Sequence, residues 1–152
     1  MYYYTSPKAL GYLVYKLDPV GLIQAIVFTD TLPTDAIPAI VPLNGVFDVY
    51  FKEKKDFPVK LLSKDIGGTE FQRAIWKVIS EIPFGEVITY NELARRAGKP
   101  GAARAAGTAC GKNPVALAIP CHRVVRTSGE DYGYSWGFAR KKWLLEFEGV
   151  QL

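Results

Sequence analysis

A helix-turn-helix pattern in the middle of the chain constrains the fold more than any other feature. Thr89, followed three residues later by Glu92, is a capping pattern for a helix that runs to about Ala97. Residues 98–101, Gly-Lys-Pro-Gly, end this helix because glycine and proline are unfavourable in helix interiors. Residues 102–109 are mostly small and predict a second helix directly after the turn. Its small side chains permit either close approach to DNA or tight packing inside a helical bundle.

Two further helices are expected on either side of this unit. Thr69 and Gln72 form a capping-box pattern for a helix that precedes it. A last helix is predicted from about Phe138 to a stop at Gly149. Residues 66–152 are therefore predicted to form a mostly helical C-terminal domain.

The N-terminal part of the chain has the pattern of a small α/β lobe. Residues 12–17 and 22–28 are rich in β-branched and aromatic types and flank Asp-Pro-Val-Gly at 18–21, which predicts an antiparallel hairpin. Apolar residues at helical spacing predict a helix over 43–54. With this lobe and its linker in residues 1–65, the chain is predicted to have an α+β fold in two domains.

Composition excludes several classes of protein. There is no run of about eighteen apolar residues for a membrane helix and no leader pattern at the N-terminus, so we expect a soluble, unexported, cytoplasmic protein with no membrane partner. The two cysteines, Cys110 and Cys121, are expected to be free thiols. One histidine and no Cys-x-x-Cys pair leave too few ligands for a structural zinc site, so no metal is expected.

Basic residues are concentrated between Leu93 and Gly129, a segment without Asp or Glu. It holds seven of the 19 Lys and Arg residues, which leaves 12 against 15 Asp and Glu in the rest of the chain. The seven are Arg95, Arg96, Lys99, Arg104, Lys112, Arg123 and Arg126. A local positive field of this kind indicates a polyanionic partner, although a solvated face of a basic protein has the same composition.

Cys121 and the only histidine, His122, are neighbours within this basic segment. A thiol has an ordinary pKa of about 8.5, so it needs a base or positive surroundings to be nucleophilic at neutral pH. Adjacent strand residues point to opposite sides, so we expect a turn here or a water between the two side chains. A carboxylate should orient the imidazole. The candidates by residue type are Glu130, Asp131, Glu146 and Glu148. The other interpretation of Cys121, and the one adopted for Cys110, is a buried structural thiol.

The chain resembles the O6-alkylguanine-DNA alkyltransferases around this cysteine. The matching motif is Pro120-Cys121-His122-Arg123-Val124, with Asn113-Pro114 before it and Gly133-Tyr134-Ser135 after it. The resemblance extends over about residues 69–149, whereas the first 65 residues match only loosely. It implies a ribonuclease-H-like N-terminal lobe and a winged-helix-like C-terminal unit.

The resemblance also implies catalytic roles. Cys121 would accept the alkyl group after activation through water by His122, and Glu148 would fix the imidazole. Asn113 would hydrogen-bond across the turn between the DNA-binding helix and the active-site segment. Tyr90 would lie near the target phosphate and guanine N3, where it would help to rotate the nucleotide and protonate the leaving base.

The implied partner is double-stranded DNA that contains O6-alkylguanine, with O4-alkylthymine as a further substrate. Arg104 would enter the duplex from the minor groove and fill the space of the extruded guanine. Further DNA contacts would come from Tyr90, Arg95, Arg96, Lys99, Lys112 and Arg123. The lesion pocket would be lined by Val124, Tyr134, Ser135 and Trp136. Alkyl transfer would be irreversible and stoichiometric, without a cofactor, and the protein would act as a monomer.

Two departures from the family pattern are visible. The zinc cluster of some vertebrate members has no counterpart, because His122 is the only histidine. Trp136 stands where several relatives have glycine, and its volume predicts a narrower pocket that disfavours bulky adducts such as benzyl.

Two other functions are compatible with parts of the sequence. A cysteine hydrolase or thiol redox protein would use the Cys121–His122 pair but would not need Arg104. A non-catalytic sensor of alkylated DNA would use the helix-turn-helix but would lack the acceptor cysteine, which is present here.

Overall fold

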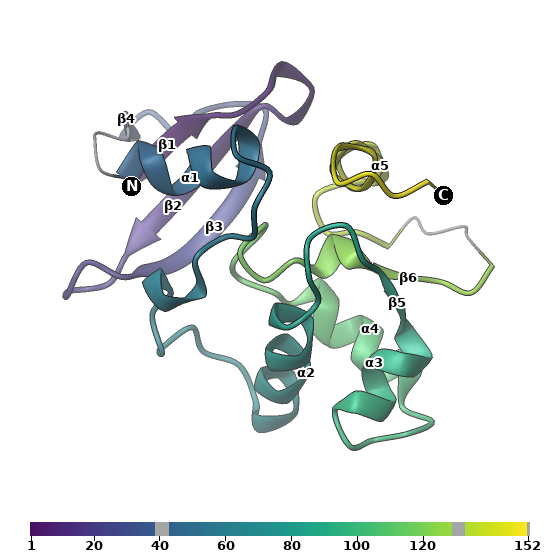
Figure 1. Ribbon diagram of the computed structural model, residues 1–152. Helices are drawn as coiled ribbons and strands as arrows, with labels where there is room; N and C mark the ends of the chain where they lie inside the picture. The colour runs from purple at the N-terminus through teal and green to yellow at the C-terminus, as the bar shows by residue number, and fades with distance from the viewer. Residues whose placement is uncertain (39–42, 129–132, 152) are drawn as a thin grey trace. The chain divides into compact units, whose positions relative to one another are not determined.

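A computed structural model describes three stretches of the chain: residues 1–38, 43–128 and 133–151. The fold mixes helices and strands, as predicted, and the chain separates into two compact units (Figure 1). The units are Met1–Ile66 with Pro114–Ala118, and Gly67–Asn113 with Ile119–Leu152. No helix in the described stretches is both long and apolar enough to cross a membrane.

The first unit is built on a four-stranded sheet in the order β3-β2-β1-β4. The strands are β1 (Tyr2–Thr5), β2 (Tyr12–Leu17), β3 (Ile23–Thr29) and β4 (Ile37–Pro38). β1, β2 and β3 are antiparallel neighbours, whereas β4 runs parallel to β1. The predicted hairpin is confirmed as β2 and β3, and the Asp18 carboxylate stabilises its turn by accepting from the backbone N–H groups of Val20 and Leu22.

One helix, α1 (Leu43–Phe51), covers a face of this sheet (Figure 1). Phe47 attaches it, because its ring lies 5.0 Å from the ring of Tyr4 and 5.2 Å from that of Tyr15. The helix ends before Lys54, its predicted limit, which has a left-handed backbone with φ 53°. Short 3-10 turns at Lys8–Leu10 and Val59–Leu61 connect these elements.

A later piece of the chain, Pro114–Ala118, belongs to the first unit. The Ile26 N–H of β3 donates to the Pro114 carbonyl at 3.0 Å, and the Ala116 N–H donates to the Ile26 carbonyl at 2.9 Å. A boundary at residue 65 would assign this piece to the C-terminal domain. The pairing is not visible in sequence because it joins backbone atoms almost 90 residues apart.

The second unit contains four helices in its described residues: α2 (Glu70–Ser80), α3 (Tyr90–Arg96), α4 (Ala103–Gly111) and α5 (Phe138–Phe147). Two short strands, β5 (Ile88–Thr89) and β6 (Val124–Val125), pair in parallel. The Thr69–Gln72 capping box is confirmed with both of its hydrogen bonds. Trp76 of α2 donates from its indole N–H to the Ala109 carbonyl at 2.9 Å, which fixes α2 against α4.

The helix-turn-helix is formed by α3 and α4. Thr89 caps α3 by accepting from the Glu92 N–H. The Glu92 side chain forms ion pairs with Arg95 and Arg96. Of the predicted capping pattern, the Thr89 hydrogen bond is therefore present, and the Glu92 carboxylate has a different role. The buried positions of α4 are Ala106, Ala109 and Cys110, and these small side chains let the helix pack closely against its neighbours.

Candidate functional site

Cys121 begins a 3-10 turn, Cys121–Arg123, which confirms the turn expected at the Cys-His pair. Asn113 holds this turn from the end of α4. Its side-chain amide donates to the Ile119 carbonyl at 2.8 Å and to Cys121 Sγ at 3.2 Å. Cys121 is only 4% exposed, so the sulfur lies in the interior but against a polar amide.

Burial dominates the acidity of the thiol. It raises the pKa of Cys121 to about 11, although the hydrogen bond from Asn113 and the positive charge of Lys141 act in the opposite direction. The resting sulfur is therefore a thiol at neutral pH, not the ionised group that its basic segment suggested. Any nucleophilic reaction requires a base that removes this proton.

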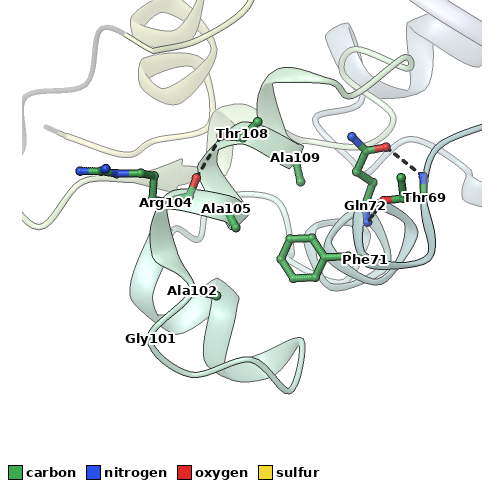
Figure 2. A pocket seen from close by; sticks show the side chains of 9 residues that line it. All are labelled: Thr69, Phe71, Gln72, Gly101, Ala102, Arg104, Ala105, Thr108 and Ala109. Carbon is green, nitrogen blue, oxygen red and sulfur yellow. Dashed lines mark hydrogen bonds between the residues drawn. The ribbon is translucent and has the colours of Figure 1, made fainter.

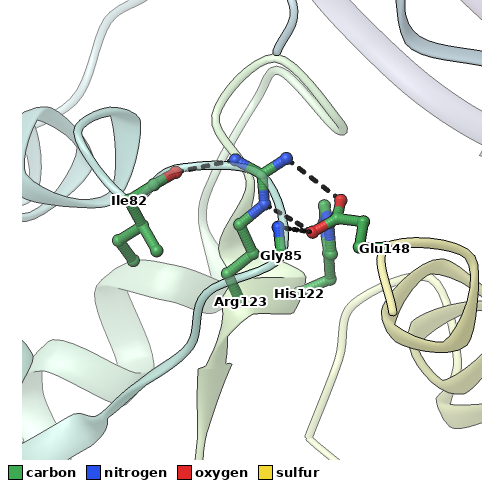
Figure 3. A network of polar contacts seen from close by, with 5 residues as sticks. All are labelled: Ile82, Gly85, His122, Arg123 and Glu148. Atoms are coloured by element: carbon green, nitrogen blue, oxygen red, sulfur yellow. Dashed lines mark hydrogen bonds and ion pairs between the residues drawn. The ribbon is translucent and has the colours of Figure 1, made fainter. Parts of the chain in front are cut away.

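The imidazole of the next residue is the candidate base. His122 is completely buried, and its Nε2 lies 2.7 Å from a carboxylate oxygen of Glu148, just beyond the end of α5 (Figure 3). Burial lowers the pKa of His122 more strongly than the hydrogen bond to Glu148 raises it, so the ring is neutral. Glu148 therefore accepts from Nε2–H, which leaves Nδ1 with its lone pair. Nδ1 is buried and has no hydrogen-bond partner within the described residues.

Glu148 is one of four carboxylates considered from the sequence. Glu146 is exposed, and Glu130 and Asp131 lie outside the described residues. Burial tends to raise the pKa of Glu148, but hydrogen bonds and charge from His122 and Arg123 outweigh it and lower the pKa to about 2. Since His122 is neutral, we assign the charge part of this effect to Arg123.

Arg123 was predicted to contact DNA, and this prediction is wrong because the side chain lies in the interior. The side chain is only 2% exposed. Its Nε and Nη2 donate to the two Glu148 oxygens at 2.8 and 3.0 Å, and Nη1 donates to the Ile82 carbonyl at 2.7 Å (Figure 3). Arg123 therefore fixes the carboxylate that holds the histidine and is not available to a DNA phosphate.

A tight turn brings the chain between α2 and β5 close to this network. The Gly85 N–H lies 3.4 Å from a Glu148 carboxylate oxygen (Figure 3). Gly85 has φ 85°, and a Cβ at this position would come within 3.2 Å of the Glu148 carbonyl oxygen. Both the backbone conformation and the close approach therefore require glycine.

Tyr90 and Arg104 line a cavity of about 440 Å³ on the helix-turn-helix. Arg126 and Gly133 complete its wall with residues of α4. The Tyr90 ring packs on Gly107, where a Cβ would lie 3.6 Å from two ring atoms. This glycine thus lets the aromatic side chain lie directly against α4.

The remaining basic residues differ in how freely their charge faces solvent. Arg95 and Arg96 share the Glu92 carboxylate at 2.6 and 2.9 Å, so their charge is partly balanced. Four others are exposed and have no ion-pair partner among the described residues: Lys99, Arg104, Lys112 and Arg126. The positive surface is therefore smaller than the count of seven suggested.

A second cavity, of about 640 Å³, lies between α4 and the start of α2. Figure 2 shows Phe71 beside the small residues of α4, with the Arg104 side chain extending away from it. The wall is mostly apolar. Ala105 and Thr108 are exposed here, so α4 presents a smooth surface next to its arginine.

The four predicted pocket residues have different surroundings. Val124 and Tyr134 are buried, and the Tyr134 hydroxyl has no hydrogen-bond partner among the described residues. The Trp136 ring meets the Tyr134 ring edge-on at 5.4 Å and is partly exposed. The Ser135 hydroxyl donates to the Gly111 carbonyl at the end of α4.

Sequence reasoning missed Lys141. It is completely buried on α5, and its Nζ donates to the Val124 carbonyl at 2.6 Å. A signal was present, because Lys141 precedes Leu144 and Leu145 by one helical turn and therefore shares their buried face.

Comparison with known proteins identifies the family. Residues 70–150 match the family model of the 6-O-methylguanine DNA methyltransferase, DNA binding domain. The chain belongs to this methyltransferase family. A methylated-DNA–protein-cysteine methyltransferase of Mycobacterium leprae is 44% identical over 120 residues, which cover 74% of this chain and 71% of that protein. That of Shigella flexneri is 51% identical over 86 residues, covering 57% and 50%.

Solved structures agree with this assignment to the methyltransferase family. Mycobacterium tuberculosis OGT in complex with DNA has a TM-score of 0.80 and 35% identity, covering 97% of this chain and 92% of that one. The O6-methylguanine-DNA methyltransferase of Pyrococcus kodakaraensis has a TM-score of 0.75 and 28% identity, covering 98% and 99%. By contrast, an alignment to a probable methyltransferase of Acanthamoeba polyphaga mimivirus spans only 65% of that curated relative.

Proposed function

We propose that this protein repairs DNA by moving the alkyl group of O6-alkylguanine irreversibly to Cys121. One observation carries this function: a buried thiol and a neutral histidine, held by Glu148, occur in the same unit as a helix-turn-helix. The similar M. tuberculosis OGT was solved in complex with DNA, which supports the same partner for this chain.

The chemistry follows from the protonation states. His122 Nδ1 takes the Cys121 proton, directly or through one water. Nε2 keeps its own proton and continues to donate it in the hydrogen bond to Glu148. The sulfur then attacks the alkyl carbon, so that an S–C bond forms as the C–O6 bond breaks. The bonding electrons leave with guanine, and Tyr90 donates a proton to that anion. A thioether has no easy route back to a thiol, so each molecule reacts once.

The target base must leave the helix before it can meet a buried sulfur. Extrusion costs a few kcal/mol and is cheapest for a weakly paired lesion, which favours damaged bases. Arg104 is exposed at the start of α4 and lines the same cavity as Tyr90, which supports the proposal that it fills the gap left in the stack. The small exposed side chains of α4, Ala105 and Thr108, permit close approach of the helix to a DNA groove.

DNA binding without sequence preference follows from phosphate contacts by exposed cations. Lys99, Lys112 and Arg126 join Arg104 in this role, and Arg95 and Arg96 contribute to the extent that Glu92 leaves their charge free. Affinity should fall steeply as salt is raised. Val124, Tyr134, Ser135 and Trp136 form the lesion pocket in this proposal, and O4-alkylthymine is the second substrate.

Several finer features belong to the same proposal. The N-terminal lobe is ribonuclease-H-like, the C-terminal unit is winged-helix-like, and the domains divide near residue 65. The protein acts as a monomer on one lesion. It works in the cytoplasm, where cysteines stay reduced and, in a prokaryote, the DNA is found.

Intact-mass measurement after mixing with methylated-guanine duplex DNA tests this function. We expect one methyl group, located on Cys121 by peptide mapping, and no transfer to Cys121→Ser. Cys121→Ser should still bind DNA. Its affinity for unmodified duplex, compared with that of the wild type, is the control. Turnover of an ester or peroxide beyond one equivalent would indicate a hydrolase or redox protein. Tight binding of the lesion without a mass change would indicate a sensor.

A further inference from the structure

Lys141 lies among the candidate active-site residues although no motif marks it. It is 0% exposed, and its ammonium donates to the Val124 carbonyl at 2.6 Å. Its Nζ also lies 6.0 Å from the centre of the Tyr90 ring. These two contacts connect α5 with β6 and α3, on which the site is built.

Burial of an ammonium group is costly, so a completely buried lysine calls for an explanation. A carbonyl oxygen and an aromatic ring are among its partners. The ammonium charge acts on the reacting pair. Burial raises the pKa of Cys121 and the Lys141 charge opposes this, while for His122 burial lowers the pKa and the same charge lowers it further.

We infer that Lys141 is a positioning and electrostatic residue of alkyl transfer: it fixes the Val124 carbonyl, lies against the Tyr90 ring and stabilises negative charge in the pocket. This role rests on the proposed function. Negative charge develops there twice, on the sulfur when the proton leaves and on guanine when the C–O6 bond breaks. A fixed cation in a site closed to water stabilises both.

Two substitutions separate the charge from the hydrogen bond. Lys141→Gln keeps a donor for the Val124 carbonyl but removes the charge. Lys141→Arg keeps both, and its guanidinium stays charged at every pH used. Lys142→Gln is the matched control, because Lys142 is exposed on the same helix.

The first measurement needs no DNA. The rate of Cys121 alkylation by iodoacetamide is followed from pH 7 to pH 11, with mass mapping to separate Cys121 from Cys110. Because the pKa of this thiol is about 11, the scan covers the rising part of the profile, and the midpoint is obtained by extrapolating that rise. The other charged and titratable groups in this network are His122, Arg123, Tyr134, Arg140 and Glu148. They are the same in all variants, so a shifted midpoint reports on position 141. Single-turnover methyl transfer, DNA affinity and thermal unfolding are measured on the same samples.

For Lys141→Gln we expect a higher pH midpoint and methyl transfer slower by about tenfold or more, with DNA affinity unchanged. An unshifted midpoint would overturn the inference. Lys141→Arg should have a midpoint no higher than the wild type, and a higher one would overturn it even if Lys141→Gln fails to fold. Absence of methyl transfer in the wild type would count against the proposed function instead, while the iodoacetamide profiles would still decide the role of Lys141.

Discussion

Substitution of Arg123 by methionine tests the buried network most directly. Methionine keeps much of the apolar volume but removes three hydrogen bonds, two to Glu148 and one to the Ile82 carbonyl. Removal of one partner from a buried ion pair costs about 3–5 kcal/mol, because the other charge stays buried. At about 2–4 °C per kcal/mol for a chain of this size, Tm should fall by about 6–20 °C.

The same substitution should change the pH dependence of alkyl transfer. Arg123 lowers the pKa of His122 by its charge, whereas Glu148 raises it. Without Arg123 the carboxylate effect is less opposed, so the pKa of His122 rises and more of the ring is protonated at neutral pH. A protonated ring cannot accept the Cys121 proton. Transfer should therefore slow at neutral pH and recover as the pH is raised.

The assay combines chemical denaturation with single-turnover transfer from a methylated oligonucleotide between pH 6 and 9. Arg126→Met is the matched control, because it removes the same charge from an exposed position. It should alter stability by less than about 0.5 kcal/mol and weaken DNA binding without moving the pH profile. If Arg123→Met lost less than about 1 kcal/mol, as an exposed pair would, the network would not have the role described.

Four further outcomes are expected. Arg104→Ala should slow transfer from a well-paired lesion by about tenfold or more, and less from a mismatched one, because pairing sets the cost of extrusion; equal slowing would argue against a role in flipping. Trp136→Gly should raise the benzyl rate relative to the methyl rate, and an unchanged ratio would exclude a steric limit. Because the pKa of Glu148 is lowered from 4.5 to about 2, its ionisation contributes about 3 kcal/mol to the free energy of unfolding above pH 4.5, and this contribution is lost as the pH falls toward 2. Urea denaturation at several pH values should show the loss for the wild type and not for Glu148→Gln. Thr89→Ala should cost about 1 kcal/mol of stability through loss of the α3 cap, measured by the same denaturation, and a neutral effect would show that the cap is not needed.

Features of the fold that depend on neighbours in sequence could be predicted. The Thr69–Gln72 box and the β2–β3 hairpin are specified within a few residues, and both are present. The pairing of Pro114–Ala118 beside β3 could not be predicted, because no local pattern states which distant backbone will supply its hydrogen bonds.

The motif residues of the candidate site could be predicted from the sequence, but the buried charged residues around them could not. The adjacency of Cys121 and His122 predicted either a turn or a bridging water, and a turn is present. Arg123 and Lys141 were not recognised as interior residues, because charged side chains are almost always exposed unless a partner compensates them. The partner of Arg123 is 25 residues away in sequence, and a resemblance, not the residue pattern, selected Glu148 from the available carboxylates.

In the proposed function each molecule reacts once, and such a protein gains from a nucleophile that is inactive until its substrate is bound. Oxidation and alkylation by small molecules follow thiolate content and exposure. With a pKa of about 11 and 4% exposure, Cys121 offers little of either at neutral pH. In the proposed mechanism His122 supplies a base and Lys141 a positive charge inside the same unit, so that the thiol can ionise where a lesion enters. On this proposal, burial protects the Cys121 thiol from solution electrophiles, and the buried network restores its reactivity toward a base bound in the pocket.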